Sequence, residues 1–353
     1  MNMLRDVIGS HRVLVLLGAG GVGKTTSSII IALAAVKMGK RVALLSIDPA
    51  KRLAKALGIP LSNELATLKI PASYGVSGSL HAAMLDQKAV FDQMVDRHAP
   101  GAEIAAKIKS HPVYQSASTN MGGPLEYMAL AKLTDLAADP QFDLVVLDTP
   151  PDTHALDFLA RPNMLGGFMD ANVMNWLLKP FLVASRFGLG KILSASERLM
   201  GGMARVSGLE PLRQFAEFLV LMQDVIQGFH KSGELTTTLL KRPDTGFILV
   251  SVPTPTARRS IENLGTQLKS FGYNPVALLL NRCLPDSVTE ELLTSSYPGS
   301  LETYARKARG QVEIAAQLEH VATTIWRLHE REHDPGDLAG LMELADALLG
   351  GHS

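Results

Sequence analysis

The fold of this chain follows from residues 12–50, which read RVLVLLGAGGVGKTTSSIIIALAAVKMGKRVALLSIDPA. An apolar run, Val13–Leu17, predicts a buried strand, and a glycine-rich turn follows it. The next apolar run predicts a helix that ends near Met38, and the run 41–47 predicts a second strand. A strand, the pattern G-x-x-x-x-G-K-T and a helix, in this order, form the context of a phosphate-binding loop.

The glycine-rich turn has the residue types that bind a nucleoside triphosphate. Glycines let backbone N–H groups approach phosphate oxygens, and the next helix directs its positive end at them. Lys24 would bridge the β- and γ-phosphates, and the Thr25 hydroxyl would be a ligand of Mg²⁺. The alternative is a glycine-rich turn without a ligand. The absence of an N-K-x-D guanine motif disfavours GTP, and the family resemblance given below implies ATP with Mg²⁺. The expected nucleotide-binding residues of the loop are Gly18, Ala19, Gly20, Gly21, Val22, Gly23, Lys24, Thr25 and Thr26.

A second landmark is the stretch FDLVVLDTPP, residues 142–151. Four apolar residues lead into Asp148, as in a buried strand that ends on an aspartate. Behind a phosphate-binding loop, such a carboxylate holds Mg²⁺, usually through water. Apolar strands that end on an aspartate are common, so this interpretation depends on the pairing with the loop. We expect a metal site of Thr25 and, through water, Asp148.

Composition and charge exclude several classes of partner. The chain has 353 residues with 34 basic and 34 acidic side chains, so we expect no nucleic-acid partner. No signal peptide is visible, and no run outside the helix behind the loop is apolar and long enough to span a membrane. We therefore expect a cytoplasmic protein without stable membrane insertion. The single cysteine, Cys283, excludes an internal disulfide.

Strands that alternate with helical patterns predict the fold class. The runs 246–253, 275–282 and 321–328 predict further strands. We expect an α/β P-loop NTPase with a mostly parallel sheet covered by helices and an α-helical subdomain inserted in the chain. Residues 1–353 would form one ATPase domain, with a core of 1–84, 139–155 and 241–353 and a helical subdomain of 85–138 and 156–240.

The predicted helical block 155–240 is rich in methionine and phenylalanine. Methionine suits surfaces that accept varied apolar ligands, and it equally suits the interior of a helical layer. The sequence leaves both open, a groove for an apolar client and a plain core.

Together these motifs resemble the ArsA-type ATPases over nearly the whole chain. This family includes the ATPases of arsenite pumps and the ATPases that deliver tail-anchored membrane proteins. GAGGVGKTT resembles the family's P-loop, SIDPAKRLAKALG its first switch and LDTPPDTHALDFL its second switch, and LLLNRCLP resembles the strand end with its adenine-side asparagine. The resemblance implies that ATP hydrolysis drives a conformational switch.

The resemblance also implies roles for single residues. Asp48 would position and activate the attacking water, so Asp48 and Lys24 are the expected catalytic residues. Asn281 would hydrogen-bond the adenine ring, with Arg282 next to it at the nucleotide. The two switches would comprise Asp48, Pro49, Asp148, Thr149, Pro150, Pro151 and His154.

Two departures from the family pattern bear on the partner. The family's P-loop usually has a lysine after its first glycine that reaches the nucleotide of a dimer partner, and this chain has Ala19 there. The absence of this lysine should slow hydrolysis unless Lys51 or Arg52 takes its place. The arsenite-binding branch uses a cysteine cluster, which Cys283 alone cannot form. With one P-loop we expect a homodimer that handles a hydrophobic client, such as a membrane-protein segment, or a membrane pump subunit.

Three other functions stay open. A membrane-partitioning ATPase of the division-site or plasmid-partition type usually ends in a basic amphipathic helix, whereas the C-terminal residues 337–353 carry more acidic than basic side chains. A phosphotransferase or ligase would need an acceptor, for which no motif occurs. The third is a subunit that drives a pump for an oxyanion other than arsenite.

Overall fold

The computed structural model describes residues 3–47, 52–120, 124–150, 210–273, 275–294, 300–331 and 335–350. The chain divides into two compact units. The first, here called the sheet unit, comprises Met1–Asp86, Leu125–Ala160 and Thr236–Ser353. The second, the helical unit, comprises Gln87–Pro124 and Arg161–Leu235.

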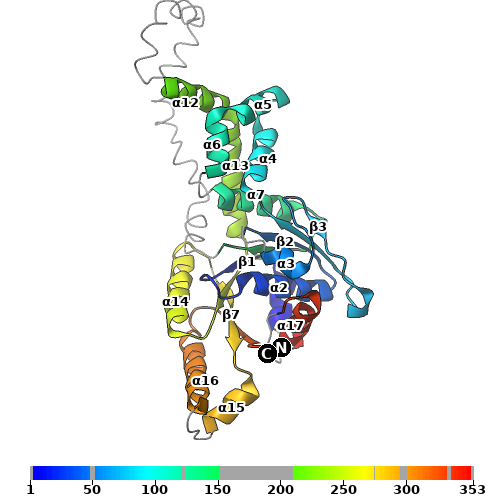
Figure 1. Ribbon diagram of the computed structural model, residues 1–353, viewed down its shortest axis with the longest axis vertical. Coiled ribbons are helices and arrows are strands. Elements are labelled where there is room, and N and C mark those ends of the chain that lie inside the picture. Colours follow the sequence, from blue (N-terminus) through cyan, green and yellow to red (C-terminus); the bar gives the residue numbers. More distant parts are fainter. Residues whose placement is uncertain are drawn as a thin grey trace, which may run out of the picture. The chain divides into compact units, whose positions relative to one another are not determined.

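The sheet unit holds one sheet of eight strands together with helices (Figure 1). The strands are β1 Val13–Leu17, β2 Arg41–Ser46, β3 Ala66–Thr67, β4 Ser79–Met84, β5 Leu144–Asp148, β6 Thr245–Ser251, β7 Pro275–Cys283 and β8 Ile325–His329. The helices are α1 Met3–Ser10, α2 Lys24–Lys37, α3 Arg52–Leu57, α7 Pro124–Ala138, α14 Pro255–Ser270, α15 Asp286–Thr294, α16 Ser300–Gln317 and α17 Leu338–Gly350, with a 3-10 turn at Ala72–Tyr74.

The strand order is β3-β4-β2-β5-β1-β6-β7-β8, and all neighbours are parallel except β3 and β4. The residues of β1, β5 and β6 are all buried, as in parallel strands that are covered on both faces. Helices α4, α5 and α6 intervene between β4 and β5, and α12 and α13 between β5 and β6. The predicted fold class, a mostly parallel sheet with helices and an inserted helical part, is confirmed.

Strand β5 lies between β1 and β2, so three motif-bearing strands are neighbours. The register places Asp148 opposite Leu16 of β1 and opposite Ser46 of β2. The sequence does not reveal this order, because β1, β2 and β5 are separated by many residues along the chain.

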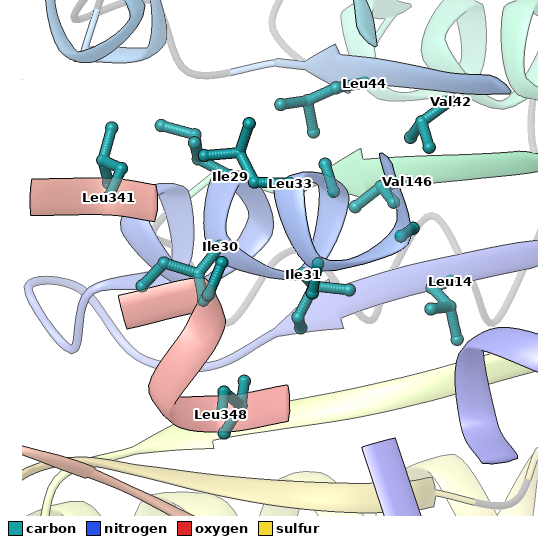
Figure 2. Close-up of a cluster of buried hydrophobic side chains, with 14 of the residues drawn as sticks. Leu14, Ile29, Ile30, Ile31, Leu33, Val42, Leu44, Val146, Leu341 and Leu348 are labelled. Carbon is teal, nitrogen blue, oxygen red and sulfur yellow. The ribbon is translucent and has the colours of Figure 1, made fainter. Parts of the chain in front are cut away.

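Helix α2 is apolar around its circumference because it is covered on two sides. Every residue in 29–36 is fully buried. Leu33 lies on the side of α2 that faces Leu44 of the sheet, and Ile30 points toward the ribbon of α17 (Figure 2). Burial of each such aliphatic side chain contributes about 1.5–3 kcal/mol. The helix behind the glycine-rich loop is therefore held firmly in the core.

The helical unit consists of α4 Gln87–His98, α5 Ala102–Ser110, α6 Pro112–Asn120, α12 Glu210–Leu221 and most of α13 Gln223–Leu240. It has an apolar core of its own, which includes Val95, Ile108, Tyr114, Phe218 and Val225. The Tyr114 hydroxyl donates to Oδ1 of Asp92 at 2.7 Å. Burial raises the pKa of Tyr114, so its hydroxyl remains a donor for this buried contact.

Some predicted bounds differ from the observed ones. The strand predicted at 321–328 is β8 at Ile325–His329. Val321 and Ala322 precede it in a turn, and their apolar side chains are buried there, which explains why the sequence suggested an earlier start. Helix α15 was not predicted. Helix α7 belongs to the sheet unit from Leu125 onward. The predicted domain boundaries stay predictions, since 151–209 lies outside the described residues.

Within the part of the chain that the structure describes, no helix has both the length and the apolarity needed to cross a membrane.

Candidate functional site

Four strands carry polar or glycine residues where they end at one edge of the sheet unit. Gly18 follows β1, Ser46 ends β2, Asp148 ends β5, and Asn281 lies near the end of β7. These strands are parallel, so their carboxyl ends meet at the same edge, where ligands of such sheets bind. The loop between β1 and α2 lies at this edge as well.

The loop between β1 and α2 requires glycine at specific positions. Gly21 and Gly23 have φ angles of 77° and 96°, in the left-handed region that favours glycine. A Cβ on Gly23 would lie 2.2 Å from Nδ2 of Asn281. A Cβ on Gly18 would lie 2.2 Å from the carbonyl oxygen of Val250. The loop backbone is thus closely enclosed, as a phosphate cradle requires.

Lys24 is the first residue of α2, and its side chain folds back into the loop. It is 6% exposed, and its Nζ donates to the carbonyl oxygens of Gly18 at 2.8 Å and of Ala19 at 2.9 Å. The positive end of α2 points to the same place. An anion in the loop would therefore meet both an ammonium group and a helix N-terminus.

Asp148 joins the loop to the ends of two strands. Its Oδ2 accepts hydrogen bonds from Oγ1 of Thr25 and from Oγ of Ser46, both at 2.8 Å. The next residue, Thr149, donates from Oγ1 to the carbonyl oxygen of Leu16 at 2.6 Å. Asp148 and Ser46 are completely buried. The predicted pair of Thr25 and Asp148 thus lies together. Ser46 is a third member, which begins the stretch that resembles the first switch but was not among the predicted site residues.

Asn281 of β7 is hydrogen-bonded to the loop between β1 and α2. Its Nδ2 donates to the carbonyl oxygen of Val22 at 2.9 Å, and its Oδ1 accepts from the backbone N–H of Arg282, also at 2.9 Å. Arg282 has a φ of 60°, and the pairing of β7 with β8 is irregular between Leu280 and Cys283. This irregularity lets both Asn281 and Arg282 line one cavity, although neighbours in a regular strand point to opposite faces. The predicted contact of Asn281 with adenine stays a prediction.

A cavity of about 740 Å³ opens at this edge and includes Gly21, Gly23, Lys24, Thr25 and Thr26 in its lining. Pockets of this size hold small molecules such as nucleotides. Beyond the predicted residues, the lining includes Arg52, Lys55 and Ala56 of α3, the residues 328–331 and Pro335. Lys55 lies within the stretch that resembles the first switch but was not among the predicted site residues, and no motif marks residues 328–331 or Pro335. Arg52, Lys55 and Ala56 are spaced i, i+3 and i+4, which places them on one face of a helix. This spacing could have indicated that Lys55 shares a face with Arg52.

Several predicted switch residues lie outside the described residues, namely Asp48, Pro49, Pro151 and His154. Of the rest, Thr149 lines the cavity, and Pro150 follows it half-buried. The roles of all these residues stay predictions.

A scan against protein-family models matches residues 11–296 to the ArsA ATPases, described as anion-transporting ATPases. The chain belongs to this family. The predicted resemblance to ArsA-type ATPases is confirmed, and so is the predicted class of enzyme, an ATPase.

Relatives of this ArsA-type ATPase include fungal proteins named ATPase GET3. The protein of Malassezia globosa is 27% identical over 269 residues, which cover 76% of this chain and 71% of the relative. The protein of Aspergillus terreus is 27% identical over 270 residues, which cover 76% and 72%. That of Aspergillus niger is 26% identical over 270 residues, which cover 76% and 71%.

The one cysteine of this ArsA-type ATPase lies in β7, close to the cavity. Cys283 is buried, and burial raises the pKa of its thiol to about 11. The thiolate is the form that binds soft metals and metalloids. Since Cys283 is the single cysteine of the chain, a cysteine cluster for arsenite cannot form within it.

Ser46→Ala is expected to lower ATP turnover about tenfold. The Ser46 hydroxyl donates to the buried carboxylate that also holds Thr25, and a hydrogen bond to a charged group contributes about 1.5–3 kcal/mol. The measurement is kcat for phosphate release, with the melting temperature as a check of folding. Ser260→Ala, at an exposed serine of α14, is the matched control. Wild-type turnover in Ser46→Ala would contradict this role of the network.

Proposed function

We propose that this ATPase uses Mg²⁺ and that hydrolysis drives a conformational switch in a cytoplasmic homodimer that handles a hydrophobic client or a membrane pump subunit. The observation that carries the proposal is Oδ2 of Asp148, which accepts from Thr25 and Ser46 at 2.8 Å each. Ser46 stands two residues before Asp48, and Asp148 directly precedes Thr149. A shift of the Thr25 hydroxyl when the phosphates change would therefore be transmitted to both predicted switches through Oδ2 of Asp148.

The residues present fit a magnesium ion. Mg²⁺ prefers oxygen ligands, keeps several waters and is usually held by one or two protein groups together with substrate phosphates. The Thr25 hydroxyl and the Asp148 carboxylate are such groups: Thr25 lines the cavity, and its hydroxyl donates to Oδ2 of the buried Asp148 at 2.8 Å. When bound, Mg²⁺ would neutralise charge on the phosphate oxygens.

Lys24 of the loop and Asp48 of the first switch have the main catalytic roles in this proposal. The ammonium of Lys24 would exchange the carbonyls of Gly18 and Ala19 for oxygens of the β- and γ-phosphates. It would then stabilise the charge that develops on these oxygens during transfer. Asp48 would orient the attacking water and accept its proton. Loss of the γ-phosphate would release both switches.

The helical unit has two exposed large apolar side chains among its described residues, which a hydrophobic client would contact in this proposal. Val220 of α12 and Leu235 of α13 are 42% and 55% exposed. Phe218 and Met222 of the methionine- and phenylalanine-rich block are buried in the core of the same unit, as in the plain-core alternative. Other methionines of this block, such as Met164 and Met200, lie outside the described residues, so the choice between groove and core stays open there.

The proposal is tested on the purified chain without any acceptor. Phosphate release should require Mg²⁺ and stop on addition of EDTA. Light scattering should give twice the monomer mass with a non-hydrolysable ATP analogue, and a fluorescent peptide with one apolar helix should bind in that state and dissociate with ADP. A monomer in both nucleotide states would contradict the homodimer. Equal peptide binding in both states would contradict the switch.

A further inference from the structure

Helix α3 turns a basic face toward the nucleotide cavity. Leu53 and Leu57 are buried in the core of the sheet unit, and they lie on one side of the helix. Arg52, Lys55 and Ala56 follow the spacing i, i+3 and i+4, which places them together on another side, and all three line the cavity. The apolar anchors thus determine which side chains α3 presents to a ligand.

The charge of the lining is strongly positive. Among the lining residues that the structure describes, five are basic, Lys24, Arg52, Lys55, Arg282 and Arg331, and one, Glu330, is acidic. A cleft with one sign of charge concentrates ligands of the opposite sign. The cavity is therefore suited to an anion with several charges.

Some of these charges already have partners within the protein. Arg331 pairs with Glu343 at 2.8 Å, and Glu330 pairs with Lys307. Lys24 donates to carbonyls of the loop. The Lys55 ammonium, in contrast, has no hydrogen bond or ion pair within the described ranges, although its helix is anchored in the core. It is an exposed cation at the rim of a cavity for an anion.

We propose that Lys55 is a further substrate-binding residue, which contacts the phosphate chain of ATP from α3. This rests on the proposed function of the site. In the loop, residues 18–26, Lys24 is the one cationic side chain, whereas a triphosphate carries several negative charges. The flexible four-carbon stem of lysine lets its ammonium follow the phosphates. Because α3 begins four residues after Asp48, Lys55 also links the bound phosphates to the helix behind the first predicted switch.

The test is the affinity for a fluorescent ATP analogue, measured with Lys55→Ala, Lys55→Arg and the control Lys69→Ala. Lys69 is an exposed lysine of the sheet unit outside the cavity lining. Lys55→Ala should bind about tenfold more weakly, as expected for loss of one charge-assisted contact. Lys55→Arg should retain most of the affinity, and Lys69→Ala should bind as wild type. The difference between Lys55→Ala and wild type should shrink as the salt concentration rises.

Lys24→Ala, measured in parallel, separates this proposal from the proposed function. Equal affinities of Lys55→Ala and Lys69→Ala, with binding lost in Lys24→Ala, would overturn the role of Lys55 alone. Unchanged binding in Lys24→Ala would overturn the nucleotide site itself and, with it, this proposal. Thermal unfolding of each variant shows whether it is folded, and the exposed position of Lys55 predicts no change in melting temperature.

Discussion

Lys24→Ala is expected to lower ATP turnover roughly a thousandfold. In the structure its ammonium lies within the loop, at 2.8 and 2.9 Å from two carbonyl oxygens, where the N-terminus of α2 also points. Alanine removes the one side-chain cation of the loop. A positioned charge that acts on the transferring phosphoryl group supplies several kcal/mol of transition-state stabilisation. The measurement is phosphate release at saturating Mg²⁺ and ATP.

Two controls accompany Lys24→Ala. Lys69→Ala makes the same change in charge at an exposed position and should keep wild-type turnover. The melting temperature of Lys24→Ala without nucleotide shows whether loss of the two loop contacts also unfolds the chain. A folded Lys24→Ala variant with turnover within threefold of wild type would contradict the assignment of the loop as the ATP site.

Asp48→Asn is expected to retain ATP binding and to lose turnover by roughly a hundredfold or more. An amide has the shape of the carboxylate but cannot accept the proton of the attacking water, and general bases contribute about 10²–10⁴ in rate. Binding should persist because Lys24, Thr25 and the loop backbone remain. Single-turnover phosphate release and equilibrium binding separate the two effects. Wild-type turnover in Asp48→Asn would contradict its role as the base.

Asp48→Asn can also be used to identify the partner that this protein binds. Asp48→Asn held with Mg²⁺ and ATP should stay in the state that binds the client, so crosslinking in the source cells followed by mass spectrometry identifies what is bound. Enrichment of proteins with single apolar helices would support the client role. Recovery of only a second copy, or of one soluble protein, would contradict that role and indicate a regulatory switch.

The sequence by itself determined the features that depend on local order. Gly18–Lys24 between a buried strand and an apolar helix was sufficient to predict a sharp glycine-rich turn between the two, and the φ angles of Gly21 and Gly23 lie in the region that favours glycine. The apolar run into Asp148 was sufficient for a strand that ends on a carboxylate. These patterns are read from neighbouring residues, so no knowledge of the sheet is needed.

Only the tertiary structure decided which distant residues meet at the loop. Ser46 donates to Asp148 because β2 and β5 are adjacent in register. Asn281 donates to the carbonyl oxygen of Val22 because β7 lies only one strand, β6, away from β1 in the sheet. Lys55 lines the cavity because buried leucines orient α3. None of these contacts has a sequence pattern of its own, since each depends on the order of strands in the sheet and on which faces the core covers.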